Sequence, residues 1–353
     1  MQGMMVGSAF IVSRPSCTAL RVKECLFLLV KAIEAKTIAR FPCFLLSLRT
    51  LLPLHCRPLC YNNPEAIRHS EAKDSPGDFM LRQPAVAGYF YQGTSSRLRD
   101  QVEHFLVPGK TRVRARGIIS PHAGLVYSGA VAGAVYSRIV IPETAILIGP
   151  NHTGLGAPVS IMAEGRWMTP LGQVPVDEGL ASSIRSRSRR VQDDSLAHLR
   201  EHSLEVQLPF LQHLRDDVRI VPIQMLDTRL ETCTDLGNAV AGAVSEREAG
   251  SEGDASRVLI VASTDMSHYI SAKEAKERDR HALDRILALD PEGLFTVVRD
   301  EHITMCGYGP VVAMLKACKA LGASRAELIK YANSGEVSGD YEQVVGYAGV
   351  VVY

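Results

Sequence analysis

Short, uniformly apolar runs recur along the chain, and each one stops at residues that favour turns. The run at 145–148 is followed by Gly149 and Pro150, and similar runs occupy 116–120 and 257–263. A brief run of β-formers that does not alternate between apolar and polar positions is typical of a strand buried on both faces. Because such strands occur in parallel sheets covered by helices, the pattern predicts a layered α/β fold.

Segments with a helical spacing of apolar residues separate these strands, and further strands complete the alternation. The expected helices cover 94–106, 129–139, 177–184, 201–214, 232–244, 272–289, 291–299 and 310–321. The additional short strands are expected at 159–162, 167–174, 219–224, 327–331 and 344–352. We therefore predict one α/β domain with a central, largely parallel sheet covered by helices.

A few residues predict where helices begin, bend or end. Asp177 precedes a helical pattern and can cap its N-terminus, and Pro310 is expected in the first turn of its helix. Pro209 lies inside the predicted helix 201–214 and indicates a kink there. The segment 245–256 is rich in Gly, Glu and Ser and is expected to be a loop.

The first 79 residues differ from the rest of the chain in charge and cysteine content. They carry a net charge of +4, whereas residues 80–353 carry −3, and they hold five of the eight cysteines. A basic segment with few acidic residues is typical of a targeting presequence, and the alternative is a misannotated start that precedes the true start at Met80. We expect 1–79 to be a disordered or untranslated extension, dispensable for one α/β domain at 80–353.

The composition of the chain indicates which kinds of partner to exclude and in which cellular compartment to expect the protein. A formal net charge of +1 over 353 residues gives no reason to expect a nucleic-acid partner. The longest apolar patch, 41–48, ends at Arg49, so no charge-free run is long enough to span a bilayer. Three widely spaced cysteines in 80–353 do not make a disulfide framework. We expect a cytoplasmic protein that contacts neither nucleic acid nor membrane.

Five residues with metal-ligand or acid–base chemistry lie in predicted turns. His122, His152, Asp265 and His268 follow the buried strands, and Cys306 lies in a loop next to glycine. Because the carboxyl ends of parallel strands meet at one edge of a sheet, we expect these turns to converge. A mixed set of imidazole, carboxylate and thiolate suits iron, copper or zinc. The alternative is that the histidines are hydrogen-bonded turn residues, that Asp265 caps a helix and that Cys306 fills the core.

Asp265 and His268 are three residues apart in the sequence and can face the same cavity. An imidazole ionises near neutral pH and can shuttle protons, and a neighbouring carboxylate can orient it. We therefore assign His268 as a general acid or base and Asp265 as its orienting partner.

Other side chains can complete the same cleft. His202 lies on a predicted helix and can point inward, while Glu205 on the same helix is expected to have a structural role. Tyr127 precedes a small-residue helix whose free amide groups can hold an anionic group of a substrate. Trp167 can line a pocket or fill the core. We therefore take Tyr127, Trp167 and His202 as candidate substrate-binding residues.

Seven short motifs, in order from about residue 81 to residue 353, resemble the Memo family. They are P-A-V-A-G-Y-F-Y, P-H-A-G, G-P-N-H, W-M-T-P-L-G, E-H-S-L-E-V-Q-L-P-F, S-T-D-M-S-H-Y and M-C-G-Y-G-P, which start at Pro84, Pro121, Gly149, Trp167, Glu201, Ser263 and Met305. The resemblance implies one α/β domain similar to that of class III extradiol dioxygenases, which hold a non-haem iron ion. It also implies a metal site at His122, His152 and Cys306, with Asp265 and His268 beside it.

The thiolate of Cys306 departs from the dioxygenase pattern of two histidines and a glutamate. A softer ligand favours copper or redox chemistry. The resemblance therefore implies an iron or copper protein with redox or dioxygenase-like activity on an unknown small-molecule or peptide ligand. Prokaryotic members are associated with a radical-SAM protein in the AmmeMemoRadiSam system, and the compact end of this chain is similar to theirs, so we expect partners of that kind.

Two further hypotheses compete with a metal-dependent oxidoreductase. In one, the same cleft binds a peptide or a partner protein and catalyses no reaction. In the other, Cys306 is the nucleophile of a hydrolase and His268 or His152 is its base. The metal content of the purified protein separates the metal hypothesis from both alternatives.

Overall fold

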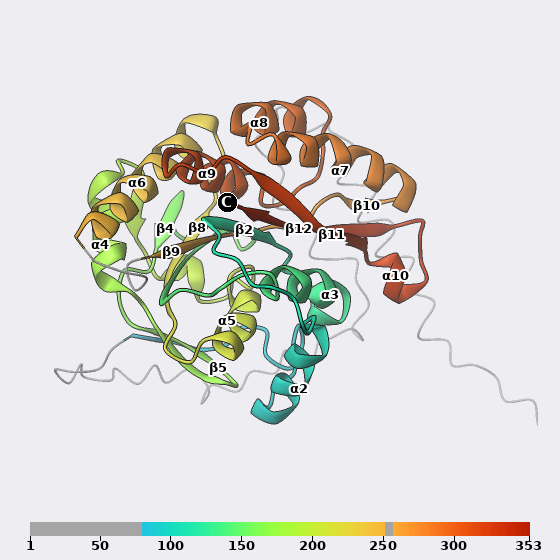
Figure 1. Cartoon of the computed structure of the whole chain (residues 1–353), viewed down its shortest axis with the longest axis horizontal. Coiled ribbons are helices and arrows are strands. Elements are labelled where there is room, and N and C mark those ends of the chain that lie inside the picture. The colour runs from blue at the N-terminus through green and yellow to red at the C-terminus, as the bar shows by residue number, and fades with distance from the viewer. Residues whose placement is uncertain (1–79, 251–256) are drawn as a thin grey trace, which may run out of the picture. The chain divides into compact units, whose positions relative to one another are not determined.

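A computed structural model describes residues 80–250 and 257–353. The expectations for 1–79 and for residues 251–256 of the predicted loop therefore lie outside the described residues. Within this part of the chain, nine strands form one mixed sheet. They are β2 (Gly117–Ser120), β3 (Thr144–Pro150), β4 (Val159–Ile161), β7 (Val191–Asp193), β8 (Arg219–Met225), β9 (Val258–Ser263), β10 (His268–Ile270), β11 (Ala326–Asn333) and β12 (Val344–Val352). Their order across the sheet is β10, β12, β2, β9, β3, β8, β4, β7, and β11 pairs with β12 (Figure 1).

The centre of the sheet consists of parallel strands that are buried throughout. β2, β9, β3 and β8 run parallel, with Ile118 beside Val261 and Ile146 beside Ile260. Every residue of β2, β3 and β9 is buried, which confirms the strands predicted from uninterrupted apolar runs. β12 and β4 join this centre in antiparallel fashion, so the sheet is parallel in its middle and mixed towards its margins.

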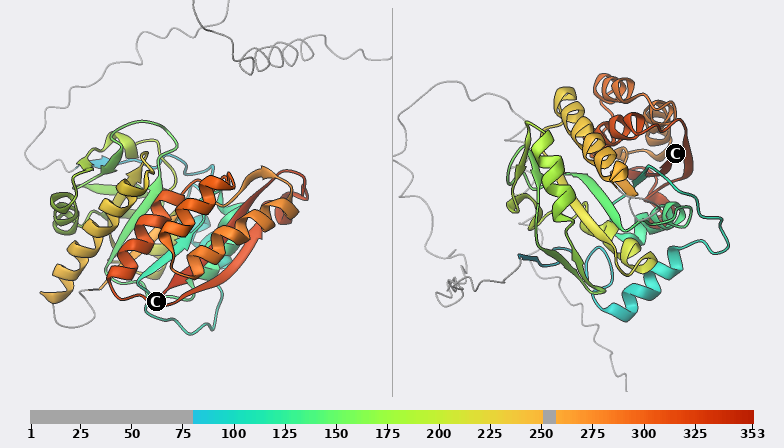
Figure 2. Two further views of the ribbon diagram at one scale, coloured as in Figure 1. Left: turned by 90° about the horizontal axis from the view of Figure 1, so that it is seen from above. Right: turned by 60° about the vertical axis from the view of Figure 1, so that its left-hand side comes forward.

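Two layers of helices cover the two faces of the sheet, which confirms the α/β architecture (Figure 1). One layer, whose members lie side by side in Figure 2, contains α6 (Leu230–Ala249), α7 (Ala272–Leu287), α8 (Pro291–Asp300) and α9 (Tyr308–Ala320). The other layer contains α2 (Ser95–Phe105), α3 (Leu125–Tyr136) and α5 (Leu208–Leu214). α4 (Glu178–Arg187) packs against α6, and α10 (Gly335–Ser338) follows β11.

The segment predicted as one helix over 201–214 has a different structure. Its first two residues are irregular, a turn follows at residues 203 and 204 and a 3₁₀ turn at η2 (Glu205–Gln207), and α5 begins only at Leu208. Pro209 therefore occupies the first turn of α5 and produces no kink. The Glu201 carboxylate accepts the backbone N–H groups of the next two residues, and this local hydrogen bonding replaces the first helical turn.

Two other helices extend beyond their predicted bounds. α3 begins at Leu125, so Tyr127 lies inside its first turn and does not precede the helix. α6 continues to Ala249, into the segment expected to be a loop, because the Glu and Arg residues at 245–249 are good helix formers. Pro310 lies in the first turn of α9, as predicted.

A second, three-stranded sheet joins the start of the described chain to the domain. β1 (Leu81–Arg82) pairs in parallel with β5 (Arg166–Thr169), and β5 forms a hairpin with β6 (Gly172–Pro175). The strand predicted at 167–174 is therefore divided by a turn into β5 and β6, which pair with each other, while β4 belongs to the nine-stranded sheet. The remaining 3₁₀ turn is η1 (Leu196–His198). Throughout 80–250 and 257–353, no helix combines the length and the apolar character needed to cross a membrane.

Asp177 joins three elements of the fold by hydrogen bonds. Its carboxylate caps α4 by accepting from the N–H of Leu180 at 3.1 Å, as predicted, and it also accepts from Thr144 and Arg247. Burial opposes ionisation of Asp177, but these donors outweigh burial and lower its pKa. We expect Asp177→Ala to lower the free energy of unfolding by about 1–2 kcal/mol.

This stabilisation by Asp177 depends on pH. A carboxyl whose pKa is lower in the folded state stabilises fully above its unfolded pKa of about 3.9. The stabilisation is lost as pH falls through the folded pKa. Urea unfolding of the wild type and of Asp177→Ala should therefore differ most near neutral pH and converge below about pH 4. A difference that stays constant over this range would contradict the role of the charge.

Candidate metal centre

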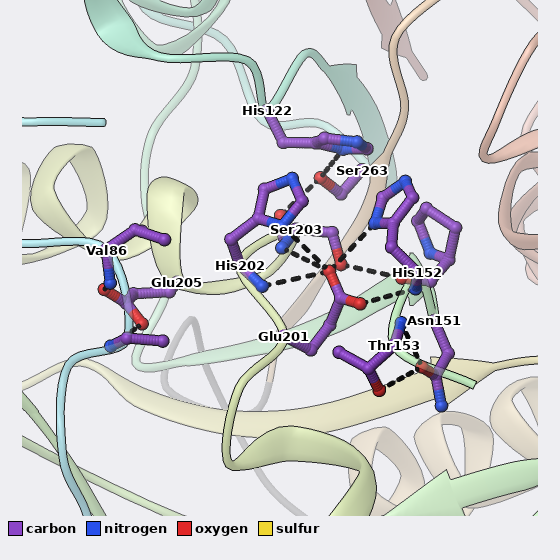
Figure 3. Close-up of polar contacts among 12 residues, drawn as sticks. Val86, His122, Asn151, His152, Thr153, Glu201, His202, Ser203, Glu205 and Ser263 are labelled. Atoms are coloured by element: carbon purple, nitrogen blue, oxygen red, sulfur yellow. Dashed lines mark hydrogen bonds and ion pairs between the residues drawn. The ribbon is translucent and has the colours of Figure 1, made fainter. Parts of the chain in front are cut away.

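Three of the predicted turns open at the same edge of the sheet. β2, β9 and β3 are neighbours and run parallel, so the turns after them bring His122, Asp265 and His152 to one carboxyl edge. The ring centroids of His122 and His152 lie 5.2 Å apart. The structure therefore brings together residues from turns that were expected to converge (Figure 3).

A third imidazole, His202, completes a cluster with His122 and His152. Its ring centroid lies 4.8 Å from that of His152 and 5.5 Å from that of His122. One ligand nitrogen from each of the three residues lies within 4.8 Å of the others, so these side chains form a group that can hold a metal ion. Figure 3 shows the three rings around a common space.

The carboxylate of Glu201 holds two of these histidines in place. Glu201 is fully buried and accepts hydrogen bonds from His152 Nδ1 at 2.9 Å and from the backbone N–H groups of His152, His202 and Ser203. Burial alone would raise the pKa of Glu201, but the hydrogen bonds from His152 and Ser203 lower it to about 2. At neutral pH Glu201 is therefore ionised and can only accept hydrogen bonds.

This acceptor determines where His152 carries its proton. Because Glu201 accepts from Nδ1, that nitrogen is protonated, and Nε2 of the neutral ring keeps its lone pair for a metal ion. Burial opposes protonation of His152, but the hydrogen bond and the charge of Glu201 outweigh burial and raise the pKa of the imidazole. A carboxylate behind a histidine is a common arrangement at metal sites, where it orients the ligand.

Ser263 determines the proton position on His122 in a similar way. Its hydroxyl donates to the carbonyl of Ser203 at 2.6 Å and accepts from Gln207 at 3.0 Å. Since the single hydroxyl proton is used, the contact of 2.9 Å with His122 requires Nδ1 of His122 to be the donor. Burial, and then the neighbouring His202, lower the pKa of His122 well below its usual value. His122 is thus neutral, with its Nε2 lone pair available.

Cys306 adds a sulfur atom beside His122. Its Sγ lies 3.4 Å from His122 Nε2 and accepts the N–H of Asp265 at 3.3 Å. Burial raises the pKa of the Cys306 thiol, and the charge of Asp265 raises it further. Without a metal ion the thiol therefore keeps its proton at neutral pH. Because a metal-bound cysteine is a thiolate, binding of an ion here would release that proton.

Asp265 contacts His122 and not the residue that it was expected to orient. Its Oδ1 accepts the N–H groups of His122 at 2.8 Å and Ala123 at 3.3 Å, and its Oδ2 lies 4.0 Å from His122 Nε2. In the described part of the chain, no hydrogen bond joins Asp265 to His268, and Asp265 caps no helix. Burial raises the pKa of the Asp265 carboxyl. Because Asp265 accepts two backbone N–H groups of the turn after β2, its role is to fix that turn.

Thr304 orients His268. The N–H of His268 donates to the Thr304 hydroxyl at 2.7 Å, and His268 Nδ1 lies 2.9 Å from the Thr304 carbonyl. A carbonyl oxygen accepts only, so Nδ1 carries the proton and Nε2 of the neutral ring can accept another. The predicted role of His268 in proton transfer is compatible with this geometry, and Thr304 takes the orienting role expected of Asp265.

The remaining two candidate substrate-binding residues have different surroundings. Tyr127 is 40% exposed, and its N–H donates to the Gly124 carbonyl, so this amide is not free for an anion. Trp167 is fully buried, with the Arg82 guanidinium 4.2 Å from its ring centroid and His198 at its edge. Trp167 fills the core, which was the alternative role considered for it, whereas the Tyr127 ring is accessible to a ligand.

Tyr269, next to His268, has a strained backbone. Its φ is 59°, in the left-handed region, and the pairing of β10 with β12 shifts register between His268 and Ile270. The side chain is 73% exposed, so little burial is lost when it is removed. A residue other than glycine costs about 1–2 kcal/mol in this region, whereas glycine costs about 0.5–1 kcal/mol in chain entropy.

We therefore expect Tyr269→Gly to raise the free energy of unfolding, by up to about 1 kcal/mol. The matched control is Tyr269→Ala, which removes the ring but keeps the strain and should give no gain. Urea unfolding measures both variants. Equal stability of the two would show that the bulge at Tyr269 stores no strain.

Comparison with known proteins gives one consistent result. A family model described as "Memo-like protein" matches residues 82–351. A MEMO1 family protein of Methanothermobacter thermautotrophicus is 45% identical over 281 residues, which cover 76% of this chain and 99% of the relative. MEMO1 family proteins of Methanopyrus kandleri and Pyrobaculum aerophilum are 42% and 41% identical, and each match covers 77% of this chain and 99% of the relative.

Proposed function

Because this chain belongs to the Memo-like protein family, we propose that it binds one iron or copper ion and uses it in redox or dioxygenase-like chemistry on a small molecule or peptide. The observation that carries the proposal is the group formed by His122, His152 and His202, whose ligand nitrogens lie within 4.8 Å of one another. The proposal includes a radical-SAM partner protein, which rests on the family resemblance. It also includes a cytoplasmic location, which rests on the three widely spaced cysteines of residues 80–353.

The donors fit a redox-active metal ion. Nδ1 of His122 and Nδ1 of His152 each donate to a fixed acceptor, which leaves both Nε2 atoms for the ion. Cys306 adds sulfur as a further donor, and a set of imidazole and thiolate favours iron or copper over magnesium or calcium. When bound, the ion would supply Lewis acidity and one-electron chemistry. Three or four protein donors leave positions open for a substrate.

Two residues beside the donors can hold or accept protons. Asp265 Oδ2 lies 4.0 Å from His122 Nε2, and burial raises its pKa, so this oxygen can hold a proton next to the donors. His268 donates from Nδ1 to the Thr304 carbonyl, which leaves Nε2 as the atom that accepts a proton. We therefore assign proton transfer to Asp265 Oδ2 and His268 Nε2.

The geometry supports a thiol hydrolase less well. The base closest to Cys306 is His122, 3.4 Å away, and not His268 or His152 as the hydrolase hypothesis assumed. A nucleophilic cysteine needs a thiolate. Burial raises the pKa of Cys306 and lowers that of His122, so the proton stays on the sulfur atom and the thiolate–imidazolium pair is disfavoured.

A non-catalytic binding module is the second candidate function, and exposed aromatic side chains favour it. Tyr269, beside His268, is 73% exposed. Tyr89 is 90% exposed and adjoins Phe90, whose ring centroid lies 4.8 Å from that of His202. Exposed aromatic rings near a recessed polar cluster can bind a peptide without any metal.

Metal titration of single variants tests the proposal. Untagged protein stripped of metal is titrated anaerobically with Fe(II), and separately with copper. We expect His122→Ala, His152→Ala and His202→Ala each to weaken binding by about 10–100-fold or more, because even residues behind the ligands contribute that much. Cys306→Ser should weaken binding of copper more than that of Fe(II), since sulfur is the softer donor.

The matched control is His281→Ala. His281 is an exposed histidine on α7 that pairs with Glu301 and does not belong to the three-histidine group, and its removal should leave the affinity unchanged. Circular dichroism confirms the fold of each variant. If all three histidine variants of the cluster bind metal like the wild type, the metal proposal fails and the binding module takes its place.

A further inference from the structure

A cavity that contains none of the metal-centre residues is lined by α7 and β11. Its volume is about 430 Å³, which is in the range of sites that hold small molecules. Its apolar wall consists of Leu283 from α7 and of Leu328 and Tyr331 from β11. The cavity can therefore remove the apolar body of a small molecule from water.

The aromatic part of this wall is held rigidly. The hydroxyl of Tyr331 donates to Asp279 Oδ2 at 2.7 Å. Asp279 is fully buried in α7, and its Oδ1 accepts from the N–H of Ser267 at 3.0 Å and from the Ser267 hydroxyl at 2.6 Å. These bonds join α7, β11 and the loop before β10, so the Tyr331 ring is positioned before any ligand arrives. A preformed wall lowers the entropy cost of binding.

The rim of the cavity carries more positive than negative side chains that form no ion pair within the described part of the chain. Arg280 is paired with Asp284 at 2.6 Å, and His281 with Glu301 at 2.5 Å. By contrast, Lys273 and Lys276 form no ion pair with any residue in 80–250 or 257–353.

One acidic residue, Glu277, also lines the cavity. Among the lining side chains without an ion pair to a described residue, there are therefore two ammonium groups, from Lys273 and Lys276, and one carboxylate. The rim thus favours a monoanion over a neutral molecule or a cation.

We propose that the cavity between α7 and β11 binds a small organic anion. Its apolar body packs against Leu283, Leu328 and Tyr331, and its carboxylate or sulfonate group meets Lys273 and Lys276. The combination of an apolar wall with a few charged groups at one end is what orients such ligands in pockets. The site requires no metal at the histidine cluster, so it stands independently of the proposed function.

Two fluorescent probes that share an aromatic body test this site. Anilinonaphthalene sulfonate carries a negative charge, whereas N-phenylnaphthylamine is neutral. We expect the full chain to bind the sulfonate with a dissociation constant below about 1 mM. The double variant Lys273→Glu/Lys276→Glu should weaken binding of the sulfonate by at least about tenfold and leave binding of the neutral probe nearly unchanged. Leu328→Trp, which fills the cavity, should weaken both probes.

A control with the same change in charge is Lys319→Glu/Lys330→Glu. Neither lysine lines the cavity, and this variant should bind the sulfonate like the wild type. Circular dichroism and thermal melting establish that each variant is folded. The proposal is overturned if the wild type does not bind the sulfonate or if both cavity variants bind it as tightly as the wild type. It is also overturned if the control variant loses as much affinity for the sulfonate as Lys273→Glu/Lys276→Glu.

Discussion

Replacing Glu205 by alanine is expected to lower the free energy of unfolding by about 3–5 kcal/mol. Glu205 and Arg82 form an ion pair, and neither side chain is exposed to solvent. Removing the carboxylate leaves the guanidinium buried without a counter-charge, which is the costly way to break such a pair. Because a folded domain is stable by only about 5–15 kcal/mol, this variant should lie close to the limit of folding.

The carboxylate of Glu205 also holds the start of the described chain. Its oxygens accept from the N–H groups of Val86 (Figure 3) and Ala85, and from the Tyr91 hydroxyl at 2.5 Å. Arg82 in turn donates to the carbonyl of Glu201 at 2.6 Å. The loss of one side chain therefore leaves the buried Arg82 guanidinium and Tyr91 hydroxyl without this acceptor, together with two partly buried N–H groups. Each buried donor left unpaired costs about 1–3 kcal/mol.

Guanidinium-induced unfolding measures the effect, and Glu274→Ala is the matched control. Glu274 forms an exposed pair with Arg278 one helical turn away, and its removal should cost no more than about 0.5 kcal/mol. The double variant Arg82→Met/Glu205→Leu should lose less than Glu205→Ala, since it removes both charges together. If Glu205→Ala is as mild as Glu274→Ala, the buried pair does not stabilise the fold.

The central strands could be predicted because a strand buried on both faces needs an uninterrupted run of apolar residues. Every residue of β3 is buried, and its apolar run is uninterrupted. The segment 201–214 could not be predicted in the same way. Apolar residues at Leu204, Leu208 and Leu211 suit a helix along the whole segment. What replaces its first turn is the Glu201 carboxylate, which binds His152, 49 residues away in the sequence.

This error also hid part of the candidate site. His122 and His152 follow buried strands directly, so their convergence could be expected from sheet topology alone. His202 was assigned to a helix and considered only for substrate binding, although its ring packs against that of His152. Cys306 lies 184 residues from its neighbour His122. No local pattern can reveal such a contact. The residue type and the predicted turn made Cys306 a candidate, and the family resemblance is what grouped it with His122 and His152 as a ligand.

Replacing Glu201 by glutamine is expected to weaken metal binding by about 10–100-fold, although Glu201 is not itself in the three-histidine group. The carboxylate accepts from His152 Nδ1 and from three backbone N–H groups. A glutamine has one acceptor oxygen, so its amide nitrogen would face a donor. The loop that carries His202 would then shift, and His152 would lose the partner that presents its Nε2.

The variant Glu201→Gln should also lower the pKa of His152 in the metal-free protein, because the hydrogen bond and the charge of Glu201 are the main causes that raise it. Titration followed by NMR measures that pKa, and calorimetry with Fe(II) measures the affinity. Glu301→Gln is the matched control, since Glu301 raises the pKa of the exposed His281 in the same way. There the histidine pKa should fall while metal affinity stays the same. A fall in the His152 pKa without any loss of affinity would show that orientation of this ring by Glu201 does not matter for binding the ion.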